Sequence, residues 1–262
     1  MIQKTVLQGL AFAASFVALW FALSKLDFVK YFHIEQNRGE TEQKIGDLIW
    51  ESIEKTETVI KNDSVTEPLE KLFKHIAKEN DIDKDDIHIH IIENSEINAF
   101  ALPAGHLVVY TGLLEKCDSE SELAGVLGHE IAHIEKDHVM KKLVKEFGLA
   151  MLVSMTTGGK GGNMTREMLH KLSSTAYDRS LESEADRESV EYLEKANLDP
   201  EKFGEFLFDM SRKDAMPSAV YWVSTHPESE ERALEIIEDI KGKKFKVVKV
   251  LTDKEWKNLT AR

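Results

Sequence analysis

Cysteine is almost absent from this chain of 262 residues, since Cys117 is the only one. A single thiol excludes an internal disulfide and any zinc site built from several cysteines. Any metal site would therefore have to use histidines and carboxylates as ligands. The cysteine content does not indicate the cellular compartment.

Positive charge is also in deficit. The chain has 34 Lys and Arg against 47 Asp and Glu, which gives a net charge of −13. A surface this acidic repels phosphate backbones, so we expect no nucleic-acid partner. With 42% hydrophobic and 31% charged residues, the composition predicts a folded domain with a substantial core and a short appendage. It does not define the oligomeric state.

The N-terminus holds a long run without charge, at residues 6–23. A helix of 18 residues covers about 27 Å, close to the roughly 30 Å hydrocarbon core of a bilayer. A cleaved signal peptide, the alternative, has a shorter apolar run followed by small residues. Trp20 and Phe21 stand where those small residues would be. We therefore predict an uncleaved signal anchor, through which the protein is bound to a membrane.

The uncharged run at residues 6–23 determines where we expect the domain boundaries and in which compartment we expect the folded domain. We predict a signal anchor or signal peptide at residues 1–24, a juxtamembrane linker at 25–40 and the folded domain at 41–262. Lys4 and the terminal amine favour an N-terminus that stays in the cytoplasm. The domain is then expected outside the cytoplasm, in a bacterial periplasm, either anchored or, after signal cleavage, soluble.

Three short β-like segments lie between helical ones. Residues 87–92 alternate isoleucine with histidine, residues 98–105 include a proline suited to an edge strand, and residues 106–112 form a third segment. Amphipathic helical patterns precede and follow them. The order predicts a mainly helical α+β fold with a small antiparallel sheet beside the helices. His88 and His90 are expected on a solvated face of that sheet.

The motif HEIAH, residues 129–133, lies in a single long helix predicted over residues 119–147. Residues four apart share one helix face, so His129 and His133 can direct two imidazoles at one metal ion. Glu130 is turned by about 100° and can reach a water molecule beside the metal without binding the metal. By the same geometry His138 faces away from the pair.

A third ligand is expected from another helix. Glu182 and Asp186 are four apart in a later acidic segment. Glu182 could bind the metal, and Asp186 could accept a hydrogen bond from the far nitrogen of a ligand histidine. Spacing alone does not favour Glu182 over Glu184.

Four blocks of sequence resolve part of this ambiguity. NAFALPAGHLVVYTGLL, HEIAH, RSLESEAD and STHPESEERA follow one another in an order similar to that of the family of HtpX and the CAAX prenyl endopeptidases, the forty-eighth metallopeptidase family. The resemblance covers roughly residues 45–256 and is nearest to a single-anchor or periplasmic branch. It implies a gluzincin-type zinc metallopeptidase domain that binds one Zn²⁺ per chain.

The resemblance also assigns roles to the residues. It implies metal ligands at His129, His133 and Glu182, a catalytic carboxylate at Glu130 and supporting residues behind them. Those supporting residues are Asp186 and Arg179. Three protein ligands leave a fourth position for water, which zinc activates and Glu130 deprotonates.

Two further roles are assigned from less specific sequence motifs. His226 and Arg232 are candidate donors to the oxyanion, although His226 could instead be a fourth ligand that closes the site. The segment made of Asn98, Ala99, Phe100 and Ala101 is predicted to be an edge strand that pairs with the substrate backbone.

The predicted function is a zinc endopeptidase that hydrolyses peptide bonds in misfolded, membrane or envelope proteins. The alternative is a chaperone-like or binding module whose zinc site is closed and not catalytic.

Overall fold

The computed structural model describes residues 34–156, 162–212 and 219–261. The chain divides into two compact units, residues 1–41 and 42–262, and of the first unit only residues 34–41, the start of helix α3, are described. The predicted signal anchor lies outside the described residues, as does the first part of the predicted linker. None of the described helices combines the length and the hydropathy needed to cross a membrane.

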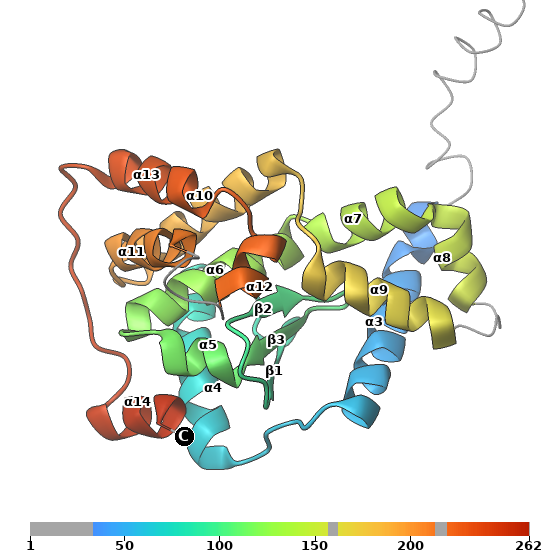
Figure 1. The fold of residues 1–262 in the computed structure, drawn as a ribbon, viewed down its shortest axis with the longest axis horizontal. Helices are drawn as coiled ribbons and strands as arrows, with labels where there is room; N and C mark the ends of the chain where they lie inside the picture. Colours follow the sequence, from blue (N-terminus) through green and yellow to red (C-terminus); the bar gives the residue numbers. More distant parts are fainter. Residues whose placement is uncertain (1–33, 157–161, 213–218, 262) are drawn as a thin grey trace, which may run out of the picture. The chain divides into compact units, whose positions relative to one another are not determined.

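Fifteen elements make up the described chain, and most of them are helices (Figure 1). In chain order they are α3 (Ile34–Thr56), α4 (Asp63–Glu79), β1 (His88–Ile92), β2 (Ala99–Ala101), β3 (His106–Tyr110), α5 (Thr111–Lys116), α6 (Glu120–Glu135), α7 (His138–Phe147), α8 (Leu149–Thr156), α9 (Gly162–Ser174), α10 (Arg179–Lys195), α11 (Pro200–Ser211), α12 (Ala219–Thr225), α13 (Ser229–Ile240) and α14 (Asp253–Thr260). The mainly helical α+β fold is confirmed.

The sheet is mixed, and the prediction of an antiparallel sheet was wrong in one of its two pairings. The strand order is β1-β3-β2, with β2 antiparallel to β3 and β1 parallel to it. Residues 93–98 carry the chain from β1 to the far edge, so that β3 returns between the two earlier strands. Because β2 reverses the chain direction and β3 reverses it again, β1 and β3 run the same way.

The two faces of the sheet are buried by different helices. One face packs against a large core formed by α4, α5, α6 and α10 to α14. The other packs against a smaller core to which α3, α7, α8 and α9 contribute. Alternation along the strands explains the division, since Ile91 and Leu107 enter the first core while Ile92 and Val108 enter the second.

The helix predicted over residues 119–147 is broken into α6 and α7. Asp137 lies between them with φ of 60°, in the left-handed region, where an α-helix of L-residues cannot continue. The break turns the start of α7 back towards α6, which changes the position of His138.

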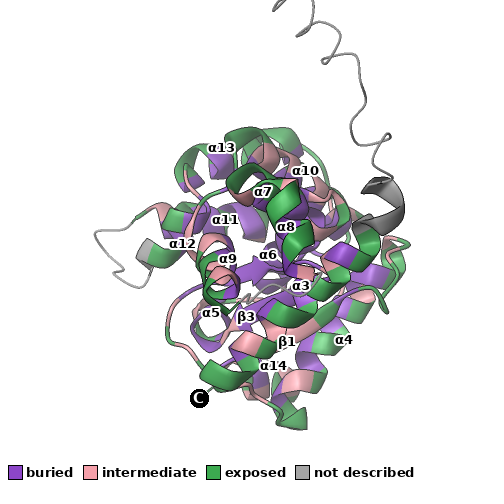
Figure 2. Cartoon of the chain, turned by 90° about the vertical axis from the view of Figure 1, so that its right-hand side faces the viewer, coloured by how far each residue is buried: buried purple, intermediate pink, exposed green. Residues whose placement is uncertain are grey.

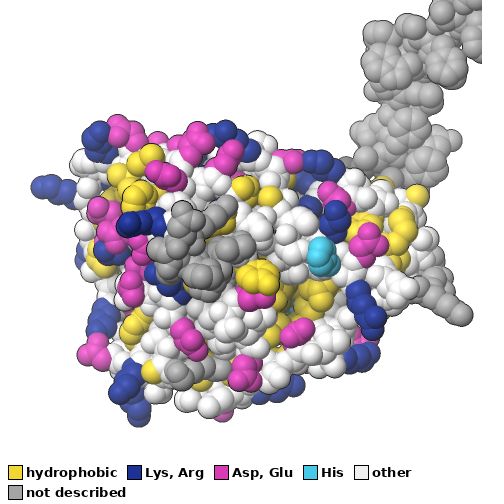
Figure 3. Space-filling view, in the orientation of Figure 1, with side chains coloured by type: hydrophobic (Ala, Val, Ile, Leu, Met, Phe, Trp, Pro, Cys, Tyr) yellow, Lys and Arg dark blue, Asp and Glu magenta, His cyan; other side chains and the backbone are white. Residues whose placement is uncertain are grey.

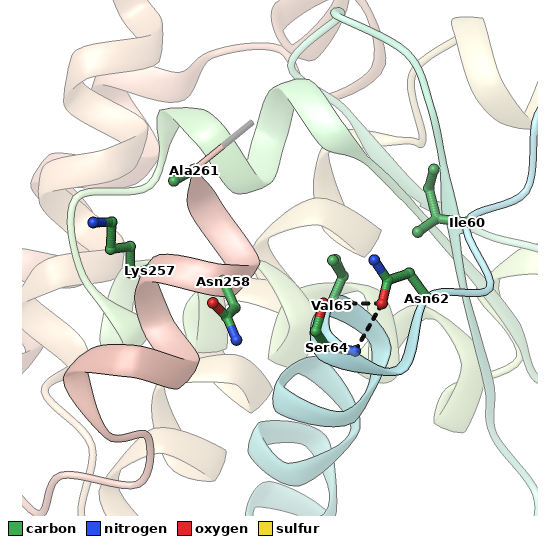
Figure 4. A pocket seen from close by; sticks show the side chains of 7 residues that line it. All are labelled: Ile60, Asn62, Ser64, Val65, Lys257, Asn258 and Ala261. Carbon is green, nitrogen blue, oxygen red and sulfur yellow. Dashed lines mark hydrogen bonds between the residues drawn. The ribbon is translucent and has the colours of Figure 1, made fainter.

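The C-terminal helix α14 returns to pack on α4. Thr252 and Glu255 form a capping box at its start, and Glu255 also pairs with Lys71 of α4 at 2.8 Å. A surface hollow of about 520 Å³ separates the end of α14 from the start of α4 (Figure 4). It is lined by Ile60, Asn62, Ser64, Val65, Lys257, Asn258 and Ala261.

Acidic and basic side chains are interspersed on the face shown in Figure 3, with hydrophobic side chains scattered among them. On this face, side chains of one charge sign therefore form only small patches.

Candidate metal centre and active site

Helix α6 carries two histidines into the interior. Its N-terminus is capped by Ser119, whose side chain accepts a hydrogen bond from the amide of Glu122. Every residue from Ser121 to His133 is buried, and Figure 2 shows α6 in the interior of the domain. Buried imidazoles require partners, because an unpaired polar group inside a protein is destabilising.

Two glycines let neighbouring helices approach α6 closely. A Cβ atom at Gly128 would lie 2.8 Å from the hydroxyl oxygen of Ser189 in α10, and one at Gly125 would lie 2.4 Å from Phe203 in α11. The hydroxyl of Ser189 donates a hydrogen bond to the carbonyl of Gly125 at 2.7 Å. This packing brings Glu182, in the first turn of α10, against the histidines.

Four buried side chains meet at this point and form what we call the histidine cluster: His129, His133, Glu182 and His226. One ligand atom of each lies within 4.8 Å of all the others, and no member is more than 1% exposed. The Nε2 atoms of His129 and His133 are 3.1 Å apart. Carboxylate oxygens of Glu182 lie 3.5 Å from Nε2 of His129 and 3.6 Å from Nε2 of His133.

Contacts behind the cluster orient the two rings of α6. Nδ1 of His129 lies 2.9 Å from Oδ1 of Asp186. The distance is that of a hydrogen bond, but the N–H group is not well aligned with the oxygen. Nδ1 of His133 lies 3.0 Å from Nδ1 of His138, whose Nε2 is 3.3 Å from Glu184. Because Nε2 of His138 donates to the carboxylate, its Nδ1 accepts the proton of His133. Both α6 histidines therefore direct Nε2 into the cluster.

The electrostatics of the cluster are asymmetric. Burial lowers the pKa of His133 to about 3. Burial also acts to lower the pKa of His129, but Asp186 and Glu182 more than compensate and raise it to about 9. For Glu182, burial is outweighed by Arg232, His226 and the α6 histidines, so its pKa lies well below the ordinary value. The cluster thus holds one anion, Glu182, beside two imidazoles whose pKa values are shifted in opposite directions.

The donor set fits zinc. A tetrahedral ion with bonds of about 2.0–2.2 Å holds neighbouring ligand atoms about 3.3–3.6 Å apart. The three separations among His129, His133 and Glu182 are 3.1, 3.5 and 3.6 Å, close to those values. Oε1 of Glu182 has no hydrogen-bond partner among the described residues, which suits a ligand oxygen.

Arg232 lies behind the cluster in α13. Its Nε and one terminal nitrogen donate to the two oxygens of Asp186 at 2.6 and 2.7 Å, and its other terminal nitrogen lies 2.7 Å from Glu182. The side chain is 4% exposed. Its donors are engaged by the two carboxylates, whereas the sequence predicted that they would face a reacting carbonyl.

Arg179, predicted to support the ligands, is located elsewhere. Its side chain is 57% exposed and pairs with Glu228 at 3.0 Å and Glu231 at 2.5 Å. These partners belong to the start of α13, so the structure does not bring Arg179 to the histidine cluster.

Glu130 is fully buried beside the cluster. One of its carboxylate oxygens accepts a hydrogen bond of 2.9 Å from the amide of Ala101 in β2. The other oxygen has no hydrogen-bond partner among the described residues and lies 3.4 Å from Nε2 of His226. Burial raises the pKa of Glu130, although His226 and His129 act in the opposite direction.

The predicted substrate strand coincides with β2 and residue 98 before it. Phe100 pairs with Val108 of β3, so that Ala99 and Ala101 direct their backbone groups to the outer edge of the sheet. Helices α6 and α9 pack against β2, and the side chain of Asn98 donates to the carbonyl of Ser173 at 3.2 Å. Asn98 and all three strand residues are buried.

Three residues near the cluster were not found from the sequence. His138 was predicted to face away, but the break at Asp137 brings it against His133. Tyr177 stacks on His133 with ring centroids 4.0 Å apart, and the ammonium group of Lys142 lies 4.1 Å from the centre of the Tyr177 ring. Burial lowers the pKa of Lys142 to about 8. Helical spacing in the sequence did not indicate that Tyr177 and Lys142 lie near the cluster.

The fold and this donor set define a metallopeptidase domain. The model of peptidase family M48 matches residues 63–240, and the chain belongs to this family. The family is zinc-dependent, in agreement with the donor set of the histidine cluster. The relationship suggested by the four sequence blocks is confirmed.

Several curated proteins are similar to the chain. The mitochondrial metalloendopeptidase OMA1 of Bos taurus is 32% identical over 160 residues, which cover 55% of this chain and 31% of that protein. The beta-barrel assembly-enhancing protease of Escherichia coli (strain K12) is 27% identical over 209 residues, 73% of this chain and 42% of that protein. The chain spans less than half the length of these relatives.

Proposed function

We propose that this protein is a zinc-dependent endopeptidase whose active site is the histidine cluster together with Glu130. The observation that carries the proposal is the arrangement of three buried ligand atoms at tetrahedral spacing, on His129, His133 and Glu182, with a buried carboxylate next to them. These three residues would hold one Zn²⁺ per chain. Zinc bound there would supply Lewis acidity, which polarises a peptide carbonyl and makes water acidic near neutral pH.

Glu130 is the proposed general base. Its oxygen next to His226 has no hydrogen-bond partner among the described residues and can accept the proton of the attacking water. The same carboxyl group then passes a proton to the leaving amine. The bond from Ala101 restrains the other oxygen of Glu130 until a substrate strand takes over that amide.

His226 and Arg232 have different proposed roles. Nε2 of His226 has no hydrogen-bond partner among the described residues and lies on the Glu130 side of its ring. Because Nδ1 lies 3.2 Å from a carboxylate oxygen of Glu182, Nε2 could donate to a developing oxyanion only with both ring nitrogens protonated. Arg232 has its donors on Glu182 and Asp186, which supports a positioning role for this side chain in place of the direct contact with substrate predicted from the sequence.

We propose β2 as the strand that pairs with substrate. It is an edge strand of the sheet, and the outward amide of Ala101 already contacts the catalytic carboxylate. An extended peptide added to this edge would have its backbone next to Glu130. Recognition through the backbone favours unfolded segments, which supports misfolded and envelope proteins as substrates.

The proposed location is outside the cytoplasm, with the chain anchored in a membrane by its N-terminal segment. The support is the run of 18 uncharged residues at 6–23. Among the relatives, the protein of Escherichia coli is a bacterial protease named for the assembly of beta-barrels, and we take this as support for a bacterial envelope location.

Metal removal tests the proposed activity. We expect the purified protein to cleave unfolded casein, to lose that activity when a chelator removes zinc, and to regain it when one equivalent of Zn²⁺ is returned. The zinc content and the cleavage rate should fall and recover together. Cleavage that persists after zinc has been removed would contradict the proposal.

A second function is favoured by one observation, the complete burial of the cluster. His129, His133, Glu182 and His226 are each 0–1% exposed, as expected for a closed zinc site in a chaperone-like or binding module. Such a module would keep its full biological activity when Glu130 is replaced by glutamine.

The replacement His226→Ala separates the two functions. If His226 stabilises the oxyanion, as we propose, its loss should lower kcat about 10²–10³-fold with little change in KM. If His226 closes the site, the same replacement should raise the rate of casein cleavage. A rise would therefore favour the closed module.

A further inference from the structure

Three histidines lie on one face of the ladder between β1 and β3, away from the histidine cluster. His88 and His90 are two residues apart on β1, so their side chains share a face. His106 opens β3 and pairs directly with His88 in the parallel register. The face is covered by α3, where Trp50 stacks on His90 with ring centroids 3.6 Å apart.

Two of these histidines already direct their nitrogens at each other. Nε2 of His90 lies 2.8 Å from Nδ1 of His106. On its far side, Nε2 of His106 is buried with no hydrogen bond to the described residues, and the nearest carboxylate oxygen, of Asp47 in α3, is 4.0 Å away. Nδ1 of His106 is therefore directed at His90, while its Nε2 lies beyond hydrogen-bond distance of Asp47.

The third histidine is free to join them. His88 is exposed, and its ring centroid lies 5.5 Å from that of His106. Rotation about its side-chain torsions, which solvent exposure permits, can bring a nitrogen towards the pair. Burial lowers the pKa of His90 to about 3 and also lowers that of His106, so both rings are neutral near pH 7, the form that binds metals.

We propose that His88, His90 and His106 form a second metal site, which binds a divalent first-row ion of the zinc class. Three imidazole nitrogens suit Zn²⁺, Co²⁺, Ni²⁺ and Cu²⁺ and do not suit Mg²⁺ or Ca²⁺. Bonds of about 2.0–2.1 Å require the two facing nitrogens to separate from 2.8 Å to about 3.3 Å, a small side-chain adjustment. The solvent side of His88 leaves a fourth position for water.

The second site has a structural consequence. Trp50 of α3 stacks on His90, so metal binding by the three histidines would also fix the ring against which this part of α3 packs. The site shares no residue with the histidine cluster, and its occupancy does not depend on the proposed peptidase function.

The test is a count of bound zinc in the full chain. We expect the wild-type protein at equilibrium with Zn²⁺ to bind one more ion per chain than the variant His88→Ala. Because loss of an outer-shell partner alone weakens metal binding about 10–100-fold, loss of this ligand should weaken the second site about 100-fold or more.

The matched control is His170→Ala. His170 is also exposed but belongs to α9, so its loss should leave the zinc count unchanged. His88 is on the surface, and its replacement should not affect folding. The proposal is overturned if His88→Ala binds as much zinc as the wild type with the same affinity, or if His170→Ala lowers the count equally.

Discussion

The variant Glu130→Gln should retain its zinc and lose nearly all peptidase activity. A positioned general base contributes about 10²–10⁴-fold to a rate, and we expect kcat/KM to fall about 10³-fold or more. The amide oxygen of glutamine can still accept the hydrogen bond from Ala101, so the fold and the position of the side chain should be preserved. What the amide lacks is the ability to accept and release a proton.

The measurement is casein cleavage alongside metal analysis of the same sample. Glu135→Gln provides the matched control, since Glu135 is on the same helix, α6, but is exposed at its end. That variant should cleave at the wild-type rate. If Glu130→Gln cleaved casein as fast as Glu135→Gln, while both contained zinc, Glu130 would not be the base.

Replacing Arg232 by methionine should strongly destabilise the protein. Its guanidinium is 4% exposed and compensates two buried carboxylates, Asp186 and Glu182. Removing one partner of a buried ion pair leaves an uncompensated charge, which lowers the free energy of unfolding by about 3–5 kcal/mol. At about 2–4 °C per kcal/mol, the melting temperature should fall by about 6–20 °C.

Arg179→Met is the matched control for this result, because it removes the same group from the surface. Arg179 pairs with Glu228 and Glu231, but its side chain is 57% exposed, so water and salt can replace those partners. Thermal unfolding of the zinc-loaded variants should show no measurable change for Arg179→Met. Equal melting temperatures for the two variants would mean that Arg232 does not compensate the buried carboxylates.

The two arginines also show what sequence can predict about such a site. The spacing of Glu182 and Asp186 on one helix face, together with the family resemblance, identified residues that the structure brings to the histidines. Arg179 lies three residues before Glu182, on the same face, but at the very start of α10. Its side chain therefore reaches the acidic start of α13, while Arg232 approaches from that other helix. Which helix supplies the guanidinium depends on tertiary packing.

The other predictions failed where the path of the backbone could not be read from local sequence spacing. Helical spacing placed His129 and His133 on one face correctly, because α6 is continuous between them. It failed for His138, since the left-handed Asp137 intervenes and no glycine or proline marks the break. Likewise, three β segments were predicted, but strand order depends on how residues 93–98 cross the sheet, and alternation within a strand carries no information about its neighbours.

On the proposed mechanism, the hydrogen bond between Ala101 and Glu130 would link substrate length to turnover. A peptide long enough to pair along β2 must take over the amide of Ala101, and in doing so it releases the carboxylate that the amide holds. A ligand too short to pair with the strand leaves Glu130 restrained, even when it reaches the metal ligands. On the proposed mechanism, selectivity for extended chains would therefore be expressed in the rate of the chemical step as well as in binding, and it would need no separate recognition domain.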